Sequence, residues 1–238
     1  MLQVVKKSLI AFALLFISNS IMAQKKINDS WIDWANFKKY EADNNKIEPP
    51  IKTETRVVFM GNSIFEGWIR LRPELFSGKP YFDRGISGQT TPQMLLRMYD
   101  DVIALQPDIM VLKAGINDIA ENTGPSTVKM ISDNIISMAD LAKINGINVI
   151  ISSILPAKSF PWNPGINPPP KISAVNKIIE QYAKENGMIY LDYYSSMVDK
   201  NNALIEDYGS DSVHPNKKGY KVMSVLAEKA IYKILNQN

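Results

Sequence analysis

Val57-Val58-Phe59-Met60-Gly61-Asn62-Ser63 places an unbroken apolar run directly before a small polar turn. A strand without polar alternation is buried on both faces, as in the parallel sheets of α/β proteins. Further apolar runs of this kind occur at 109–112, 149–151 and 188–191, and a weaker strand at 81–83 fits between the first two. The chain therefore predicts five parallel strands.

Segments with helical periodicity separate these runs, at 91–105, 126–145, 171–186 and 215–238. Gly146 and Gly187 follow two of them, at the position where a helix often ends in a left-handed residue. Alternating strands and helices imply right-handed crossover connections. We therefore expect an α/β protein: a doubly wound three-layer α/β/α sandwich with a five-stranded parallel sheet.

The beginning of the chain is typical of a secretory signal peptide. Lys6 and Lys7 precede a largely apolar stretch at 8–21, and Ala23 supplies the small residue at which cleavage is expected. The apolar stretch is shorter than the roughly 20 residues of a spanning helix, which disfavours the alternative of an uncleaved anchor. Residues 1–23 therefore predict export to the periplasm or the outside, with no stable membrane insertion afterwards.

Residues 24–50 are expected to form a helical segment that packs on a single domain at 51–238. Trp31, Trp34, Phe37 and Tyr40 are three apart, so they share one side of a helix predicted at 28–47. Packing on the body is the favoured role, and an aromatic platform for sugars is the alternative. Pro49-Pro50 ends the segment.

Charge and composition exclude several classes of partner. The net charge of +3 falls to +1 when the two lysines of the signal peptide are removed, which leaves no electrostatic case for nucleic acid. The sequence has no cysteine and one histidine, so disulfides and thiolate metal sites cannot form and a structural zinc site lacks ligands. We expect neither a metal nor a cofactor.

His214 is the one imidazole in the sequence, and it lies three residues after Asp211. A serine hydroxyl needs a neighbouring base, and the base needs a third group that fixes its tautomer. Ser63, His214 and Asp211 could fill these roles. Alone, a single histidine is more often an ordinary loop residue, and Gly61-Asn62-Ser63 could be a plain turn with a helix cap.

The positions of the polar segments favour the catalytic interpretation. Ser63 follows the first predicted strand, 85–88 follows the second, 115–118 follows the third, and the loop of Asp211 and His214 precedes the last helix. Ligands of open parallel sheets bind at the carboxyl ends of the strands, so these segments are expected to share one crevice. The backbone N–H groups of Ser63 and Gly88 and the side-chain amide of Asn117 could stabilise an oxyanion there.

The connection at 155–170 contains six prolines together with Phe160 and Trp162. Prolines can hold a long loop in a defined shape, so we expect this loop to form a wall of the substrate cleft. Asn62, Phe160 and Trp162 are the residues that we expect to contact the substrate.

These segments resemble the blocks of the SGNH hydrolases, or GDSL-type esterases and lipases, over nearly the whole mature chain. The matching stretches are Phe59-Met60-Gly61-Asn62-Ser63, Arg84-Gly85-Ile86-Ser87-Gly88-Gln89-Thr90-Thr91, Ala114-Gly115-Ile116-Asn117-Asp118 and Asp211-Ser212-Val213-His214-Pro215. The resemblance implies a flavodoxin-like fold, Ser63 as nucleophile, Gly88 and Asn117 as oxyanion donors, His214 as base and Asp211 as its orienting acid.

Two sequence details qualify the resemblance. Asn62 replaces the aspartate of the Gly-Asp-Ser motif, and an amide can still hydrogen-bond to hold the turn. Phe65 stands where Gly-x-Ser-x-Gly has its second glycine, which argues against the nucleophile elbow of α/β-hydrolases.

The expected function is that of a secreted serine esterase that removes short acyl groups, chiefly acetyl, from small-molecule or polysaccharide esters. A lipase or lysophospholipase is the first alternative, and a carbohydrate-binding protein without turnover is the second. A glycoside hydrolase with Asp118 and Asp211 as paired carboxylates is the third, although it leaves Ser63 and His214 without a role.

Overall fold

The structure is a computed structural model that describes residues 34–51 and 53–236. Residues 1–39 and 40–238 form two compact units, and every contact below lies within the second. The expected signal peptide and the first part of the helix predicted at 28–47 lie outside the described residues. In the described part the helix is shorter than predicted: α2 spans Lys38–Asn44, because Asn36 has a φ of 54° and interrupts the helical backbone before it.

All strand pairs of the five-stranded sheet are parallel, and the strand order is β2-β1-β3-β4-β5. The strands are β1 (Val57–Asn62), β2 (Tyr81–Ile86), β3 (Ile109–Leu112), β4 (Asn148–Ser152) and β5 (Ile189–Leu191). The predicted five-stranded parallel sheet is confirmed. β2 continues beyond its predicted end at residue 83 to Ile86, and Arg84 and Gly85 in this extension carry no apolar signal but are buried.

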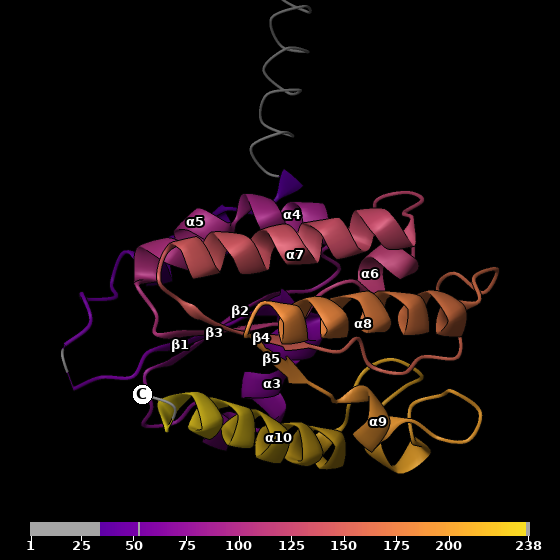
Figure 1. Cartoon of the computed structure of the whole chain (residues 1–238). Helices are drawn as coiled ribbons and strands as arrows, with labels where there is room; N and C mark the ends of the chain where they lie inside the picture. Colours follow the sequence, from indigo (N-terminus) through magenta and orange to yellow (C-terminus); the bar gives the residue numbers. More distant parts are fainter. Residues whose placement is uncertain (1–33, 52, 237–238) are drawn as a thin grey trace, which may run out of the picture. The chain divides into compact units, whose positions relative to one another are not determined.

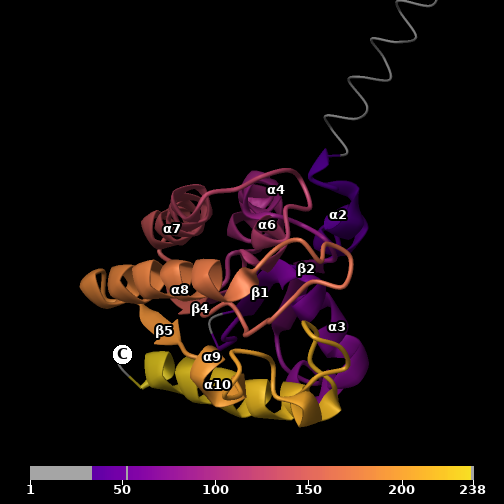
Figure 2. The ribbon, with the colours of Figure 1, turned by 90° about the vertical axis from the view of Figure 1, so that its right-hand side faces the viewer.

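Helices cover both faces of the sheet, and Figures 1 and 2 show the resulting three layers. One face carries α4 (Thr91–Leu96), α5 (Met98–Asp101), α7 (Val128–Ile144) and α8 (Pro168–Glu185), and the other carries α3 (Ser63–Leu71) and α10 (Lys217–Leu235). The doubly wound α/β/α sandwich is therefore confirmed. The remaining short elements are η1 (Pro73–Leu75), η2 (Ile103–Leu105), α6 (Ile116–Ile119), α9 (Tyr194–Met197) and η3 (Glu206–Tyr208).

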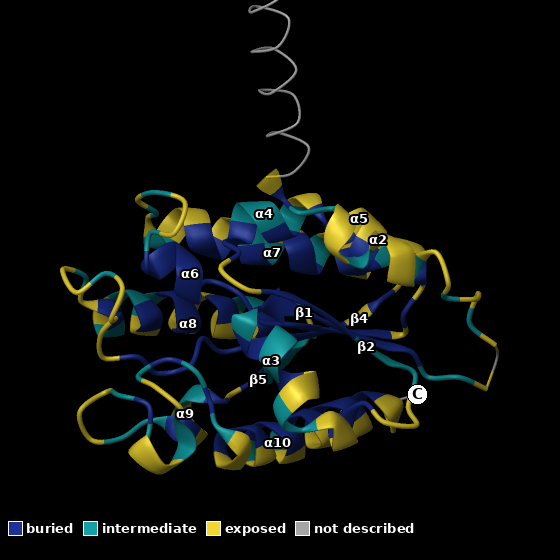
Figure 3. Ribbon diagram, turned by 180° about the vertical axis from the view of Figure 1, so that it is seen from behind, coloured by how far each residue is buried: buried dark blue, intermediate teal, exposed yellow. Residues whose placement is uncertain are grey.

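Alternate residues of β1 enter two separate cores. Val58 and Met60 pack toward α7 and α8, whereas Val57 and Phe59 pack toward α3 and α10. The Phe59 ring contacts Trp68 edge-on, with ring centroids 5.8 Å apart. Figure 3 shows the sheet as a buried layer between helices whose outer faces are exposed. Burial on both faces explains why the strand sequences are uniformly apolar.

Two predicted segments differ in the structure. The helix predicted at 91–105 is divided into α4, α5 and η2, and at the first break Arg97 is fully buried, where its Nε donates to Gln89 Oε1 at 2.8 Å. The proline-rich loop is shorter than predicted, because residues 168–170 form the first turn of α8. Proline is tolerated there, since the first N–H groups of a helix have no intrahelical partner.

The compact unit that contains the sheet begins at Tyr40 and so includes most of α2. The Tyr40 hydroxyl donates to the Gly85 carbonyl, and Arg84 Nε donates to Asn44 Oδ1 at 2.9 Å. The Arg84 guanidinium also lies over the Tyr40 ring, 4.7 Å from its centroid. These contacts fix α2 to the end of β2.

The strand order places a crevice at the carboxyl end of β1. β1 lies between β2 and β3 in the sheet. The connection that leaves β1 runs through α3 on one face, and the connection that leaves β3 runs through α7 on the opposite face. Open α/β sheets bind ligands at such a reversal. Ser63 directly follows β1 at this point.

Candidate active site

Ser63 is the first residue of α3, and the turn before it is held by Asn62. The Asn62 side chain accepts a hydrogen bond from Ile64 N at 3.3 Å and so caps the helix. Asn62 is 1% exposed. The expectation that Asn62 contacts substrate is therefore wrong for this structure, and its role here is to shape the turn that presents Ser63.

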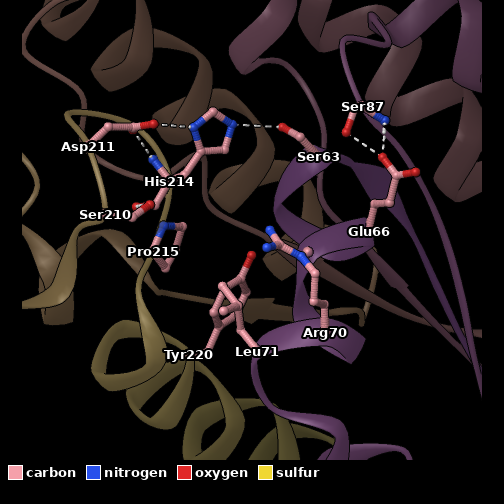
Figure 4. A pocket seen from close by; sticks show the side chains of 11 residues that line it. Ser63, Glu66, Arg70, Leu71, Ser87, Ser210, Asp211, His214, Pro215 and Tyr220 are labelled. Carbon is pink, nitrogen blue, oxygen red and sulfur yellow. Dashed lines mark hydrogen bonds and ion pairs between the residues drawn. The ribbon is translucent and has the colours of Figure 1, made fainter.

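Ser63, His214 and Asp211 form a chain of hydrogen bonds (Figure 4). Ser63 Oγ lies 3.0 Å from His214 Nε2, and His214 Nδ1 lies 2.9 Å from Asp211 Oδ2. The two halves of this chain come from opposite ends of the sequence. An ionised Asp211 favours the tautomer with the proton on Nδ1, which leaves Nε2 free to accept the proton of Ser63.

The loop of Asp211 holds its carboxylate in the charged form. Partial burial acts to raise the pKa of Asp211, but hydrogen bonds from the His214 and Val213 N–H groups and from the imidazole lower it below its ordinary value. Both backbone N–H groups donate to Asp211 Oδ1 at 2.7 Å. Asp211 is therefore fixed by the same short loop that carries the imidazole.

The three candidate oxyanion donors lie on elements that meet near Ser63. The Ser63 N–H is in the first turn of α3, where the helix dipole favours negative charge. Gly88 is exposed and has a φ of 79°, a left-handed conformation that suits glycine. Asn117 Nδ2 donates to the Gln89 carbonyl at 2.9 Å, which ties the end of β2 to the turn after β3.

Asp118 is placed differently from its neighbour Asn117. It is 1% exposed and accepts hydrogen bonds from Thr91 N at 3.0 Å and from Thr91 Oγ1 at 2.6 Å. Burial raises the pKa of Asp118, although the hydrogen bonds from Thr91 oppose that rise. Asp118 therefore anchors α4 and does not face the crevice with Asp211, so a glycosidase pair of these two carboxylates lacks its geometry.

A pocket of about 630 Å³ opens beside Ser63. Residues of α3, the turn after β2, the loop before α10 and α10 itself line it: Ser63, Glu66, Gly67, Arg70, Leu71, Ser87, Ser210, Asp211, His214, Pro215 and Tyr220. Most of these side chains are polar or charged, and Figure 4 shows them around the hydroxyl and the imidazole. Within the described residues, no three His, Cys, Asp or Glu side chains are grouped as a metal site requires.

Comparison with known proteins identifies the family. The profile of the GDSL-like lipase/acylhydrolase family matches residues 59–222, which include Ser63, Gly88, Asn117, Asp211 and His214. The chain belongs to the GDSL-like lipase/acylhydrolase family. The predicted resemblance to the SGNH hydrolases is confirmed.

Two solved structures are closely similar to this GDSL-like acylhydrolase. A GDSL-like lipase from Bacteroides thetaiotaomicron is 48% identical, with a TM-score of 0.83 and coverage of 85% of this chain and 100% of that one. A protein from Bacteroides fragilis is 48% identical as well, with a TM-score of 0.84 and coverage of 85% and 99%.

Two esterases are more distant relatives. An acetylxylan esterase from Xylanibacter ruminicola is 24% identical over 220 residues, which are 78% of this chain and 45% of the relative. This chain thus spans less than half the length of that protein. An acetyl-xylooligosaccharide esterase from Geobacillus shares the fold, at 19% identity, a TM-score of 0.59 and coverage of 78% and 96%.

The loop expected to form a wall of the cleft brings Trp162, and not Phe160, to the surface of this GDSL-like acylhydrolase. Trp162 is 48% exposed, and its ring centroid lies 6.4 Å from that of His214. Phe160 is fully buried and supports the Trp162 ring at 5.3 Å. Direct contact between substrate and Phe160, which we predicted, is therefore wrong.

Two hydrogen bonds fix this loop beside the site. Trp162 Nε1 donates to Asn122 Oδ1 at 3.3 Å, and Ser212 Oγ donates to the Ser159 carbonyl at 3.3 Å. The second bond joins the loop to the segment that carries Asp211 and His214. Trp162 is thus held in place next to the imidazole.

Sequence reasoning assigned no role to the other eight pocket residues, which include the polar side chains of Glu66, Arg70, Ser87 and Tyr220. The first two could have been found, since residues three and seven positions after Ser63 share its side of a helix. Ser87 lies inside a recognised block but carried no assigned role. Tyr220 had no signal, because it enters from α10, and its hydroxyl donates to the Ile64 carbonyl at 2.6 Å.

Proposed function

We propose that this GDSL-like acylhydrolase is an exported serine esterase that removes short acyl groups, chiefly acetyl, from carbohydrates. The observation that carries the proposal is the 3.0 Å contact between Ser63 Oγ and His214 Nε2, continued by the 2.9 Å contact to Asp211. A hydroxyl, an imidazole and a carboxylate in this order are the components of acyl transfer through a serine.

The proposed reaction has two halves. Ser63 Oγ attacks the ester carbonyl while His214 Nε2 takes its proton, and the tetrahedral intermediate collapses when His214 returns that proton to the leaving alcohol. Water then attacks the acyl-enzyme with His214 again as base, which releases the acid and restores Ser63. Asp211 stabilises the imidazolium formed in each half.

The negative charge of the tetrahedral oxygen requires donors on the side of Ser63 away from His214. We assign this role to the Ser63 and Gly88 N–H groups and to the Asn117 amide. One hydrogen of that amide is used by the Gln89 carbonyl, and the other remains for the oxyanion. Such donors contribute roughly 10²- to 10³-fold each in rate.

The chemistry of the pocket at Ser63 supports a polar alcohol, because the pocket is lined mainly by polar and charged side chains. The exposed Trp162 ring beside His214 suits the apolar face of a sugar. The similarity to acetylxylan esterases agrees with this choice, and the basic and apolar pattern at 1–23 supports export.

The proposal is tested with 4-nitrophenyl acetate, butyrate and octanoate together with acetylated xylan. We expect the highest kcat/KM for acetate, release of acetate from xylan, and labelling of Ser63 by a fluorophosphonate. Ser63→Ala should abolish both turnover and labelling. A preference for octanoate would instead support a lipase, and absence of labelling in folded protein would support a binding protein without turnover.

A further inference from the structure

Arg70 lies in the pocket beside Ser63 without a charged partner of its own. Ser63, Glu66 and Arg70 are spaced so that they share one side of α3, and all three line the pocket. Figure 4 shows the Arg70 side chain directed toward the space between α3 and Tyr220. Among residues 34–51 and 53–236, no carboxylate lies within ion-pairing distance of its guanidinium.

The acidic residues of the pocket are engaged elsewhere. Glu66, one turn before Arg70, accepts hydrogen bonds from Ser87 N at 2.7 Å and from the Ser87 hydroxyl. Asp211 is bound to His214 and to two backbone N–H groups. The guanidinium therefore presents unused donors to whatever enters the pocket.

The direction of the proposed reaction decides which part of the substrate meets Arg70. His214 must protonate the leaving alcohol, so the alcohol lies on the side of Ser63 that His214 occupies. His214 and Arg70 line the same pocket, whereas Gly88 and Asn117 do not. The alcohol moiety therefore extends along α3 toward Arg70.

The separation along α3 fits a sugar between the two side chains. Seven residues at 1.5 Å each separate the Cα atoms of Ser63 and Arg70 by about 10 Å along the helix axis, and the Arg70 side chain extends from there into the pocket (Figure 4). Gly67 lets the Tyr220 hydroxyl pack directly against α3 beside this path, because a Cβ at that position would lie 2.9 Å from the hydroxyl. A group bound at Arg70 is thus close to, but distinct from, the ester itself.

We propose that Arg70 is a specificity residue that binds a carboxylate on the alcohol moiety, so that the preferred substrates are acylated acidic sugars, that is, uronates. A planar guanidinium pairs with a carboxylate through two parallel hydrogen bonds. The nearby carboxylates of Glu66 and Asp211 favour a singly charged group over a phosphate dianion. This inference rests on the proposed esterase function, because it places the leaving alcohol by the role of His214.

The test compares two substrates that differ only in the carboxylate: methyl glucuronoside and methyl glucoside, each acetylated at the same hydroxyl. We expect the wild-type protein to prefer the acidic ester. Arg70→Gln should lower the ratio of kcat/KM for the acidic over the neutral ester by roughly 10- to 100-fold, as expected for loss of a charge-assisted pair. The loss should appear mainly in KM, and Arg70→Lys should restore part of the ratio.

Arg72→Gln is the matched control, because Arg72 is a neighbouring cation that pairs with Glu74 at 3.5 Å and does not line the pocket. That variant should leave the ratio unchanged. Equal losses for both esters in Arg70→Gln, or no acidic preference in the wild type, would overturn the inference. Turnover of 4-nitrophenyl acetate distinguishes failure of the esterase function from failure of the role of Arg70. If this turnover is present and depends on Ser63, a missing preference for the acidic ester refutes only the role of Arg70.

Discussion

At the scale of single residues, the proposed proton transfer in this GDSL-like acylhydrolase depends on one imidazole. The sequence has no second histidine that could replace His214 as base. Its two ring nitrogens are both occupied, one by Ser63 Oγ at 3.0 Å and one by Asp211 Oδ2 at 2.9 Å. Without this contact, the Ser63 hydroxyl would remain a poor nucleophile at neutral pH.

His214→Ala should therefore lower kcat for 4-nitrophenyl acetate by roughly 10⁴-fold or more. His214 is partly exposed and its side chain packs in no core cluster, so we expect the urea midpoint to change little. Steady-state kinetics and urea unfolding provide the two readouts. Residues that act as a unit are not additive, so Ser63→Ala combined with His214→Ala should lose little more than either change alone. Turnover near the wild-type level in His214→Ala would refute the assignment of the base.

At the scale of elements, the position of Ser63 depends on close packing between β2 and the first turn of α3. A Cβ at Gly85 would lie 2.3 Å from Glu66 N and 2.7 Å from the Asn62 carbonyl. Both are backbone atoms, so the two elements would have to separate. Gly85 also accepts the hydrogen bond from Tyr40, which joins α2 to the same point.

Gly85→Ala should consequently lower both stability and activity. We expect a loss of unfolding free energy of about 2 to 4 kcal/mol, the range in which overpacking and backbone displacement fall. Gly78→Ala is the control: Gly78 has a φ of 71° but open space around it, so only backbone strain of about 1 kcal/mol is expected. Urea unfolding of both variants measures the difference. Equal midpoints for the two variants would contradict the proposed close packing.

At the scale of the whole molecule, two buried ionisable groups give the folding stability opposite dependences on pH. Lys113 directly follows β3 and is 1% exposed, and burial lowers its pKa from 10.5 to about 7. Asp83 in β2 is 5% exposed. Burial raises the pKa of Asp83 from 3.8 to about 7, although the hydrogen bond from Gly85 N opposes the rise.

Lys113→Met should stabilise the protein at pH 6. The unfolded chain protonates Lys113 below pH 10.5, whereas the folded chain does so only below about pH 7. Between these values the unfolded chain binds one more proton, so the free energy of unfolding falls as the pH is lowered from 10.5 to about 7. Methionine avoids the buried charge, and its advantage should be largest at pH 6 and shrink toward pH 10. Urea midpoints measured across this range test the sign.

Asp83→Asn provides the control of opposite sign. In the folded protein the pKa of Asp83 is raised, so between pH 3.8 and about 7 the folded chain binds one more proton than the unfolded chain. The free energy of unfolding therefore falls as the pH rises from 3.8 to about 7. The amide oxygen can still accept from Gly85 N, and the stabilising effect should be largest above pH 7 and vanish toward pH 4. Parallel pH dependences of the two variants would show that burial of these groups is not the cause.

The sequence predicted the sheet well because buried parallel strands are uniformly apolar, as in Val57–Asn62 and Ile109–Leu112. It predicted the end of β2 poorly, because Asp83 and Arg84 are buried through hydrogen bonds that no sequence pattern announces. The sequence also predicted that Ser63 would lie near Asp211 and His214, because loops at the carboxyl edge of a parallel sheet lie close together. Phe160 and Trp162 looked equivalent in the sequence, and only the loop conformation distinguishes them.

The short loop that carries Asp211 and His214 has a mechanical consequence. The Asp211 carboxylate binds the imidazole and two N–H groups of its own loop, so Asp211 and His214 keep their relative positions when the loop moves as a whole. A displacement of the loop that keeps these bonds intact preserves the tautomer of the ring and changes the distance between His214 Nε2 and Ser63 Oγ. The position of this one loop therefore sets how closely base and hydroxyl approach.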